Sequence, residues 1–203
     1  MIEIHHLKES RSRRITWMLE ELAVDYTVIS YDRDATTRLA PPELKAIHPL
    51  GKAPVLKDNE LVLIESGAIL EYLVEQYGHG KFVPAKGTAD YYRYLQFMHY
   101  AEGSAMLPLL LKLYVGRLGE AGAPLHPRIN SELANHFGYL NASLEGRDYF
   151  VGDTLTAADV QLSFAVQMAV RAAGRTAFPN LTRFVEMVEA RPAYQRAVQK
   201  NGE

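Results

Sequence analysis

The sequence predicts a small α/β domain followed by an all-helical domain. From residue 1 to about residue 77, short β-like runs alternate with helical ones, whereas from about residue 89 onward the apolar residues recur only at helical spacing. A length of 203 residues accommodates two small domains, and a composition of 48% hydrophobic and 23% charged residues excludes a disordered chain.

The N-terminal domain is predicted to begin with a strand, a helix and a second strand. Ile2 and Ile4 start the first strand, and residues 26–31 form the second. Between them, residues 11–23 repeat apolar side chains at steps of three and four, which predicts an amphipathic helix. The two strands are expected to be parallel, because the helix between them provides the crossover that a parallel pair needs.

The next segment is predicted to end in a β-hairpin. Residues 32–50 are polar and contain proline, with room for one short helix at 43–47. Residues 53–57 and 61–64 then flank the turn-forming pair Asp58-Asn59, which favours two antiparallel strands.

Glycines mark the boundary between the two domains. Ser66 can cap a helix that runs to about Tyr77, where Gly78 and Gly80 stop it. We therefore expect an N-terminal domain at 1–78, a linker at 79–87 and a helical domain at 88–203. The helices expected in the second domain lie near 88–118, 125–145, 156–173 and 179–199.

The composition excludes several classes of function. The chain has no cysteine, which removes disulfides, zinc-thiolate sites and any mechanism through a protein thiol. A net charge of -2 gives no field that would gather nucleic acid or an anionic membrane surface. Without a signal-like start or a long apolar stretch, the protein is expected to be cytoplasmic and to bind neither nucleic acid nor membrane.

Glu65-Ser66 follows an apolar run and opens a helix. Backbone N–H groups at such a helix start can bind a carboxylate, and Glu65 beside them can bind an ammonium group. The pair therefore offers both halves of an α-amino acid site. The alternative is that Ser66 only caps the helix and Glu65 is a solvated charge.

Lys52-Ala53-Pro54 precedes the third predicted strand. Because proline has no N–H for the ladder, the simple interpretation is the start of an edge strand. A cis Ala53-Pro54 bond would instead expose the backbone of Ala53 for pairing with an extended peptide ligand.

Ser10 lies between the first strand and the first helix, where a hydroxyl can face a ligand thiol near the positive end of the helix. The alternative for both Ser10 and Ser12 is helix capping. By default, the neighbouring Arg11, Arg13 and Arg14 form an exposed basic helix edge.

These features together resemble the cytosolic glutathione S-transferases. The resemblance covers nearly the whole chain and is strongest to serine-type bacterial and fungal members of the yeast type. It rests on the segments Ser10-x-Ser12-x-Arg14 with Trp17-Met18-Leu19-Glu20-Glu21-Leu22, His48-Pro49-Leu50-Gly51-Lys52-Ala53-Pro54-Val55-Leu56, Glu65-Ser66, Tyr100-Ala101-Glu102-Gly103-Ser104 and Leu155-Thr156-Ala157-Ala158-Asp159.

The resemblance implies a thioredoxin-like N-terminal domain that binds glutathione, a helical domain that lines a pocket for hydrophobic electrophiles, and a homodimer. It assigns Glu65 and Ser66 to the γ-glutamyl group and Ser10 to activation of the thiol. The remaining glutathione-binding positions are Pro54 as the cis-proline, Ala53 as the backbone that pairs with the cysteinyl unit, and Lys52 near the glycyl carboxylate. In the resembling fold, Glu102 and Met106 are candidates for the electrophile pocket.

The chain also departs from other members of that family. It has neither the tyrosine that activates the thiol in many animal classes nor the cysteine of the thiol-transferring classes, which favours serine chemistry. His5 or His6 could assist at the sulfur, although strand histidines usually serve packing. No metal site is expected, because the other histidines are dispersed and no metal-ligand spacing occurs.

Thr156-Ala157-Ala158-Asp159 has the pattern of a capping box with Asp in place of Glu, so its role is expected to be structural.

The expected activity is attack of the glutathione thiolate on hydrophobic electrophiles, with glutathione-dependent reduction of hydroperoxides as a related activity. Glutathione is then the co-substrate, and no metal is needed. The alternative is a non-catalytic binding or assembly module with a transferase-like fold. Such modules often lose the acid-serine pair, which this chain retains at Glu65 and Ser66.

Overall fold

The computed structural model describes residues 1–202 and divides the chain into two compact units. The first unit contains residues 1–82 and the C-terminal residues from Glu189 on, and the second contains Val83–Val188. This grouping differs from the expected domains at 1–78 and 88–203, because the C-terminal residues pack with the first unit.

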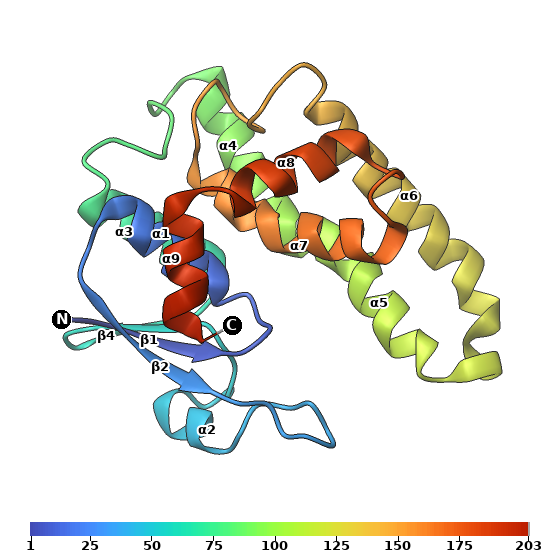
Figure 1. The fold of residues 1–203 in the computed structure, drawn as a ribbon, viewed down its shortest axis with the longest axis horizontal. Coiled ribbons are helices and arrows are strands. Elements are labelled where there is room, and N and C mark those ends of the chain that lie inside the picture. The colour runs from blue at the N-terminus through green and yellow to red at the C-terminus, as the bar shows by residue number, and fades with distance from the viewer. Residues whose placement is uncertain (203) are drawn as a thin grey trace. The chain divides into compact units, whose positions relative to one another are not determined.

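A four-stranded mixed sheet forms the centre of the first unit (Figure 1). Its strands are β1 (Ile2–Leu7), β2 (Tyr26–Tyr31), β3 (Val55–Asp58) and β4 (Leu61–Leu63), in the order β2-β1-β3-β4. The β1-β2 pair is parallel, and the β1-β3 and β3-β4 pairs are antiparallel. The expected crossover and hairpin are therefore both present.

Four helices belong to the first unit, namely α1 (Arg13–Leu22), α2 (Glu43–Ile47), α3 (Ser66–Tyr77) and α9 (Pro192–Asn201). Helix α1 contacts both α3 and α9, and it starts two residues later than predicted. Its apolar stripe is buried except at its end, where Leu22 is half-buried, and this agrees with the spacing of three and four residues. The buried stripe includes Ile15, Trp17, Met18 and Leu19.

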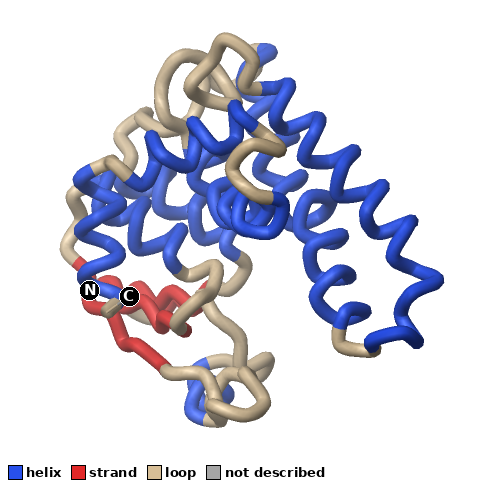
Figure 2. Tube along the Cα trace, turned by 45° about the vertical axis from the view of Figure 1, so that its right-hand side comes forward, coloured by secondary structure: helices blue, strands red, loops and turns tan. Residues whose placement is uncertain are grey.

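The second unit is helical (Figure 2). Its regular helices are α4 (Ala89–Tyr100), α5 (Met106–Gly116), α6 (His126–Ser143), α7 (Ala157–Ala173) and α8 (Pro179–Glu189). A π-helical turn at Ala101–Ala105 separates α4 from α5 where one continuous helix was predicted, and a 3-10 helix at Gly119–Leu125 precedes α6. The core of the unit gathers on α7, most of whose residues are buried.

The capping box at the start of α7 is confirmed. Asp159 is fully buried, and its carboxylate accepts hydrogen bonds from the Thr156 backbone N–H and hydroxyl, each over 2.8 Å. It also accepts a bond from the Phe150 backbone N–H over 2.8 Å. Burial raises the pKa of Asp159 to about 6, although these hydrogen bonds favour the ionised form.

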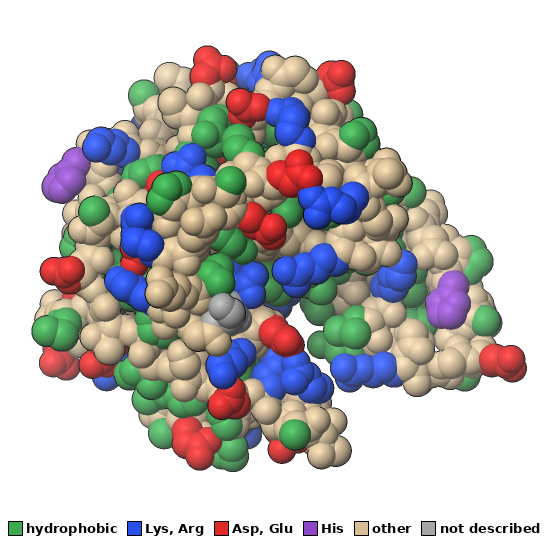
Figure 3. Space-filling model, viewed as in Figure 1, with side chains coloured by type: hydrophobic (Ala, Val, Ile, Leu, Met, Phe, Trp, Pro, Cys, Tyr) green, Lys and Arg blue, Asp and Glu red, His purple; other side chains and the backbone are tan. Residues whose placement is uncertain are grey.

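Acidic and basic side chains are interspersed over the face drawn in Figure 3. No helix within residues 1–202 has the length and apolar character needed to cross a membrane. In the same part of the chain, no three His, Asp or Glu side chains gather as a metal ion would require.

Candidate active site

A chain of hydrogen bonds occupies the turn between β1 and α1. Ser12 Oγ lies 2.8 Å from His6 Nδ1 and 2.7 Å from Ser10 Oγ. The Ser12 backbone N–H donates to Ser10 Oγ over 3.2 Å. Ser12 occupies the N-cap position of α1 without a capping bond from its side chain, so the capping alternative is wrong for this residue. The Ser10 hydroxyl oxygen accepts a hydrogen bond from one backbone N–H at this end of the helix, that of Ser12.

The three side chains differ in their access to solvent. His6 and Ser12 are completely buried, whereas Ser10 is 7% exposed. The single hydroxyl proton of Ser12 can go to His6, to Ser10 or to the Leu7 backbone carbonyl, which lies 3.4 Å away. If His6 carries its proton on Nδ1, Ser12 accepts from His6. When Ser12 then donates to Ser10, at the shorter distance of 2.7 Å, the Ser10 proton is left for a ligand. Of the three residues, only Ser10 keeps any exposed surface.

His5 points away from this chain, because neighbouring strand residues face opposite sides of a sheet. Its Nδ1 lies 2.9 Å from the Tyr31 hydroxyl, and the two rings are stacked. Burial, together with the positive charge of Lys57, lowers the pKa of His5. These contacts agree with the simple expectation that a strand histidine serves packing.

The start of α3 is built differently from the prediction. Glu65, and not Ser66, occupies the N-cap position, and Ser66 is the first residue of the helix. Glu65 has φ 65° and ψ 111°, a left-handed conformation that costs a non-glycine residue about 1 to 3 kcal/mol. Such strain often accompanies ligand sites. Glu65 is exposed, while Ser66 is buried.

Arg14 is a site residue that the sequence analysis missed. Its guanidinium donates from Nη1 to Ser66 Oγ over 3.1 Å, and the side chain is only 1% exposed. The expectation of an exposed basic edge is therefore wrong for Arg14. Its position four residues before Met18, on the buried stripe of α1, was the signal that could have revealed it.

Strand pairing brings the Lys52-Ala53-Pro54 segment to the same end of the sheet. Val55 pairs with His5 in the antiparallel β1-β3 ladder, so the residues before Val55 lie at the end of β1 that leads to Ser10. The Ala53-Pro54 peptide bond is cis. Pro54 is buried, and Lys52 is exposed.

The first unit thus places the candidate residues at the start of α1, the start of α3 and the start of β3. Hydrogen bonds join Ser10 to Ser12 and His6, and Ser66 to Arg14. Within residues 1–202, the side chains of Lys52 and Glu65 form no hydrogen bond or ion pair, so both charges are available to a ligand.

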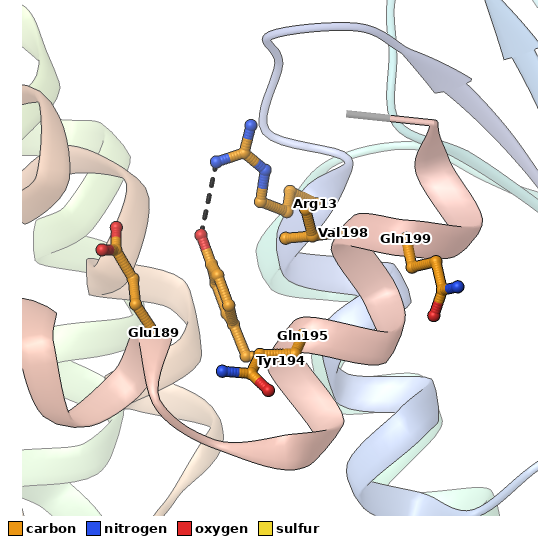
Figure 4. A pocket seen from close by; sticks show the side chains of 6 residues that line it. All are labelled: Arg13, Glu189, Tyr194, Gln195, Val198 and Gln199. Atoms are coloured by element: carbon orange, nitrogen blue, oxygen red, sulfur yellow. Dashed lines mark hydrogen bonds between the residues drawn. The ribbon is translucent and has the colours of Figure 1, made fainter.

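A hollow of about 450 Å³ lies beside the start of α1 (Figure 4). Figure 4 shows Tyr194 reaching from α9 toward Arg13, which donates to the tyrosine hydroxyl over 3.3 Å. The carboxylate of Glu189 lies across the hollow. Sequence reasoning could not find this feature, because its walls come from opposite ends of the chain.

Two family models match most of the chain. The model described as "Glutathione S-transferase, N-terminal domain" matches residues 4–75. The model described as "Glutathione S-transferase, C-terminal domain" matches residues 96–192.

Proteins with curated names are similar over nearly the whole length. Glutathione S-transferase 3 of Schizosaccharomyces pombe is 35% identical, over 98% of this chain and 88% of its own. Glutathione S-transferase 1 of Saccharomyces cerevisiae is 29% identical, over 98% of this chain and 95% of its own.

Solved structures share the fold of both units. A glutathione S-transferase from Actinobacillus pleuropneumoniae matches with a TM-score of 0.92 and 39% identity, over 100% of this chain and 93% of that one. A glutathione transferase family member from Pseudomonas fluorescens, solved with two glutathione bound, matches with a TM-score of 0.82 and 26% identity, over 97% and 92%. These matches confirm a thioredoxin-like fold followed by a helical domain.

Proposed function

The chain belongs to the glutathione S-transferase family and is a glutathione transferase. From this we propose that Ser10 donates the hydrogen bond that holds the glutathione sulfur as a thiolate. The observation that supports this role is the position of Ser10 at the accessible end of an otherwise buried chain of hydrogen bonds. Ser12 and His6 then act through Ser10 and do not touch the substrate.

The buried chain strengthens Ser10 as a donor. Ser10 Oγ accepts a hydrogen bond from the Ser12 backbone N–H. It also accepts from the Ser12 hydroxyl when His6 donates to Ser12 and the Ser12 proton goes to Ser10 at 2.7 Å instead of the Leu7 carbonyl at 3.4 Å. Accepting two hydrogen bonds polarises the Ser10 O–H, because hydrogen bonds in a chain reinforce one another. The Ser10 proton then points to the sulfur.

The magnitudes are sufficient for this mechanism. A free cysteine thiol has a pKa of about 8.5, and lowering it by two units requires about 2.7 kcal/mol. A hydrogen bond to a charged acceptor contributes about 1.5 to 3 kcal/mol, and the start of α1 adds about 0.3 to 1 kcal/mol. Ser10 and the helix end therefore supply the required stabilisation together.

The proposed binding mode uses the start of α3 for the γ-glutamyl end of glutathione. Its carboxylate accepts from the Ser66 hydroxyl and the helix N–H groups, and its ammonium pairs with Glu65. Arg14 adds a buried positive charge behind Ser66. Ala53, next to Pro54, pairs with the cysteinyl backbone, and Lys52 binds the glycyl carboxylate.

In the chemical step, the thiolate forms a bond to an electrophilic carbon of a hydrophobic substrate, and the leaving group, such as a halide, departs with its electron pair. Reduction of a hydroperoxide follows if the thiolate attacks oxygen and a second glutathione resolves the product. The relative from Pseudomonas fluorescens, with its two bound glutathione molecules, supports this second activity. A cytoplasmic homodimer completes the proposal, and Glu102 and Met106 remain the candidates for the electrophile pocket.

The test is a titration of the bound thiolate by its ultraviolet absorbance in the wild type and in Ser10→Ala. The wild type should ionise bound glutathione well below the free pKa of about 8.5, and Ser10→Ala should return it toward that value. The kcat/KM for an aromatic halide should fall about 10- to 150-fold.

Ser12→Ala provides the matched comparison. It keeps the accessible hydroxyl and removes only the buried relay, so its loss in kcat/KM should be smaller. A larger effect from Ser12→Ala than from Ser10→Ala would overturn the assignment of Ser10.

A further inference from the structure

An apolar cavity of about 170 Å³ lies among α5, α6, α7 and the segment before α8. Leu109, Phe137 and Ala169 are buried and form its inner wall, and the half-buried Leu133 and Phe178 form its sides. The rings of Phe137 and Phe178 lie 6.2 Å apart between centroids. All of these residues belong to the second unit, whereas the proposed glutathione-binding residues belong to the first.

Alanine residues keep this cavity open. Ala169, Ala172 and Ala173 recur at helical spacing along one face of α7, and Ala134 lines the cavity from α6. Ala169 is buried, whereas Ala134, Ala172 and Ala173 are exposed at the mouth of the cavity. A larger side chain at any of these positions would occupy part of the space. An apolar cavity of about 150 Å³ is large enough for a benzene-sized ring. The cavity therefore matches one aromatic ring.

Two polar side chains complete the lining at its exposed rim, namely Lys112 and Asn130. Within the part of the chain that the structure describes, the Lys112 ammonium has no ion pair and the Asn130 amide has no hydrogen bond. No acidic residue lines the cavity. A ligand with a negatively charged group beside its ring would satisfy both rim residues.

We propose that this cavity binds a small aromatic monocarboxylate of the size of benzoate. Its ring lies against Phe137 and Leu109, and its carboxylate accepts hydrogen bonds from Lys112 and Asn130. Burial of the ring supplies the affinity, and the charge at Lys112 selects the acid over neutral analogues. Glutathione, a larger and polar tripeptide, does not fit the cavity.

The test is a fluorine NMR titration of the full-length protein with 4-fluorobenzoate. We expect saturable binding that persists when glutathione is present at saturating concentration. The neutral analogue 4-fluorobenzyl alcohol should bind about tenfold more weakly, because it lacks the charge that pairs with Lys112. Displacement by glutathione, or an absence of binding at millimolar probe, would overturn the proposal.

Two pairs of variants locate the binding. Ala134→Leu fills the cavity and should weaken binding of 4-fluorobenzoate at least about tenfold, whereas Ala142→Leu, also at an exposed alanine of α6, should leave it unchanged. Lys112→Glu should weaken binding to a similar extent, and Lys86→Glu should not. Retained transferase activity and helical circular dichroism show that each variant is folded. The assigned site would be contradicted if 4-fluorobenzoate bound equally well to the two alanine variants, or equally well to the two lysine variants.

Discussion

Arg14 is the residue whose surroundings differ most from what its sequence context predicts. It stands among three arginines at the start of a helix, yet its side chain is almost completely buried against Ser66. A buried charge requires partners, so its position is specified by the structure around it. If the start of α3 holds the γ-glutamyl carboxylate, Arg14 is the positive charge that supports this end of the ligand.

We expect Arg14→Met to raise the KM for glutathione about tenfold or more while kcat changes little. The variant removes the hydrogen bond from the charged guanidinium to Ser66, and one such bond contributes about 1.5 to 3 kcal/mol, or about 10- to 150-fold in binding. It also removes the buried positive charge behind Ser66. Both effects act at the γ-glutamyl end and not at the sulfur, which predicts a change in binding rather than in chemistry. Steady-state kinetics with varied glutathione concentration measures KM and kcat separately.

Arg11→Met serves as the comparison, because Arg11 is a half-buried neighbour outside the proposed site. It should leave the KM for glutathione within a factor of about two, as expected for surface changes of less than about 0.5 kcal/mol. A fall in kcat without a rise in KM for Arg14→Met would show that Arg14 acts on the sulfur chemistry.

Among the secondary structure elements, α7 and the α4-α5 segment show what local sequence can and cannot specify. The start of α7 is specified locally, because Thr156 and Asp159 cap the helix within one turn. The π-helical turn at Ala101–Ala105 is not, because the apolar spacing around it is compatible with a regular helix. Such wide turns are frequent at functional sites, which agrees with Glu102 as an electrophile-facing candidate.

Asp159→Ala should lower the free energy of unfolding by about 1.5 to 5 kcal/mol. Loss of a capping bond alone costs about 0.5 to 2 kcal/mol. Here the substitution also leaves the Phe150 N–H without its buried acceptor, which costs about 1 to 3 kcal/mol more. Urea denaturation followed by circular dichroism measures the change.

The exposed Asp153 in the preceding loop is the matched position. Asp153→Ala should change stability by less than about 0.5 kcal/mol. If Asp159→Ala lost no more stability than Asp153→Ala, the buried hydrogen bonds would not have the role assigned to them.

For the whole molecule, the main result is that the last helix joins the first unit. Glu20 on α1 accepts from Arg196 Nε over 2.6 Å, from Lys200 Nζ over 2.7 Å and from the Tyr26 hydroxyl over 2.9 Å. Burial alone would raise the pKa of Glu20, but the hydrogen bonds from Lys200, Arg196 and Tyr26 outweigh it and lower the pKa. The ionised carboxylate therefore holds α9 to α1.

Glu20→Gln should loosen α9 before the rest of the first unit unfolds. The loss is expected to be about 1 to 3 kcal/mol, since Glu20 is buried while Arg196 and Lys200 remain about half exposed to screening solvent. Hydrogen exchange should accelerate in α9 at neutral pH. Because the folded pKa lies below the ordinary value of 4.5, the contribution of Glu20 is present above that pH and disappears as the pH falls through the folded pKa.

The pH dependence distinguishes this role from general destabilisation. In the wild type, exchange of the α9 amides, corrected for the intrinsic effect of pH, should increase on acidification below about pH 4.5, and Glu20→Gln should lose most of that dependence. Glu71→Gln, an exposed position on α3, should behave like the wild type. Equal exchange of α9 in Glu20→Gln and Glu71→Gln at neutral pH would contradict the assigned link.

Much of the fold and part of the candidate site were predictable. The alternation of apolar residues specified the strands, and the hairpin turn at Asp58-Asn59 and the capping box specified two local structures. For the site, the positions of Ser10 and Glu65 at helix starts were visible in the sequence. Two hydrogen bonds could not be predicted from the sequence, namely the one from Arg14 to Ser66 and the one between His6 and Ser12. Each depends on which side of a helix or strand faces a neighbouring element.

The sequence by itself determined the order of the elements, the absence of a protein thiol and the serine at the start of α1, because these depend on residues close together in the chain. The tertiary structure decided that Ser10 keeps more exposed surface than Ser12 or His6, that Arg14 donates to Ser66 and that α9 packs against α1. Each of these depends on burial and on charges that meet across long distances in the chain. Periodicity gives the face of a helix, and only packing decides what that face contacts.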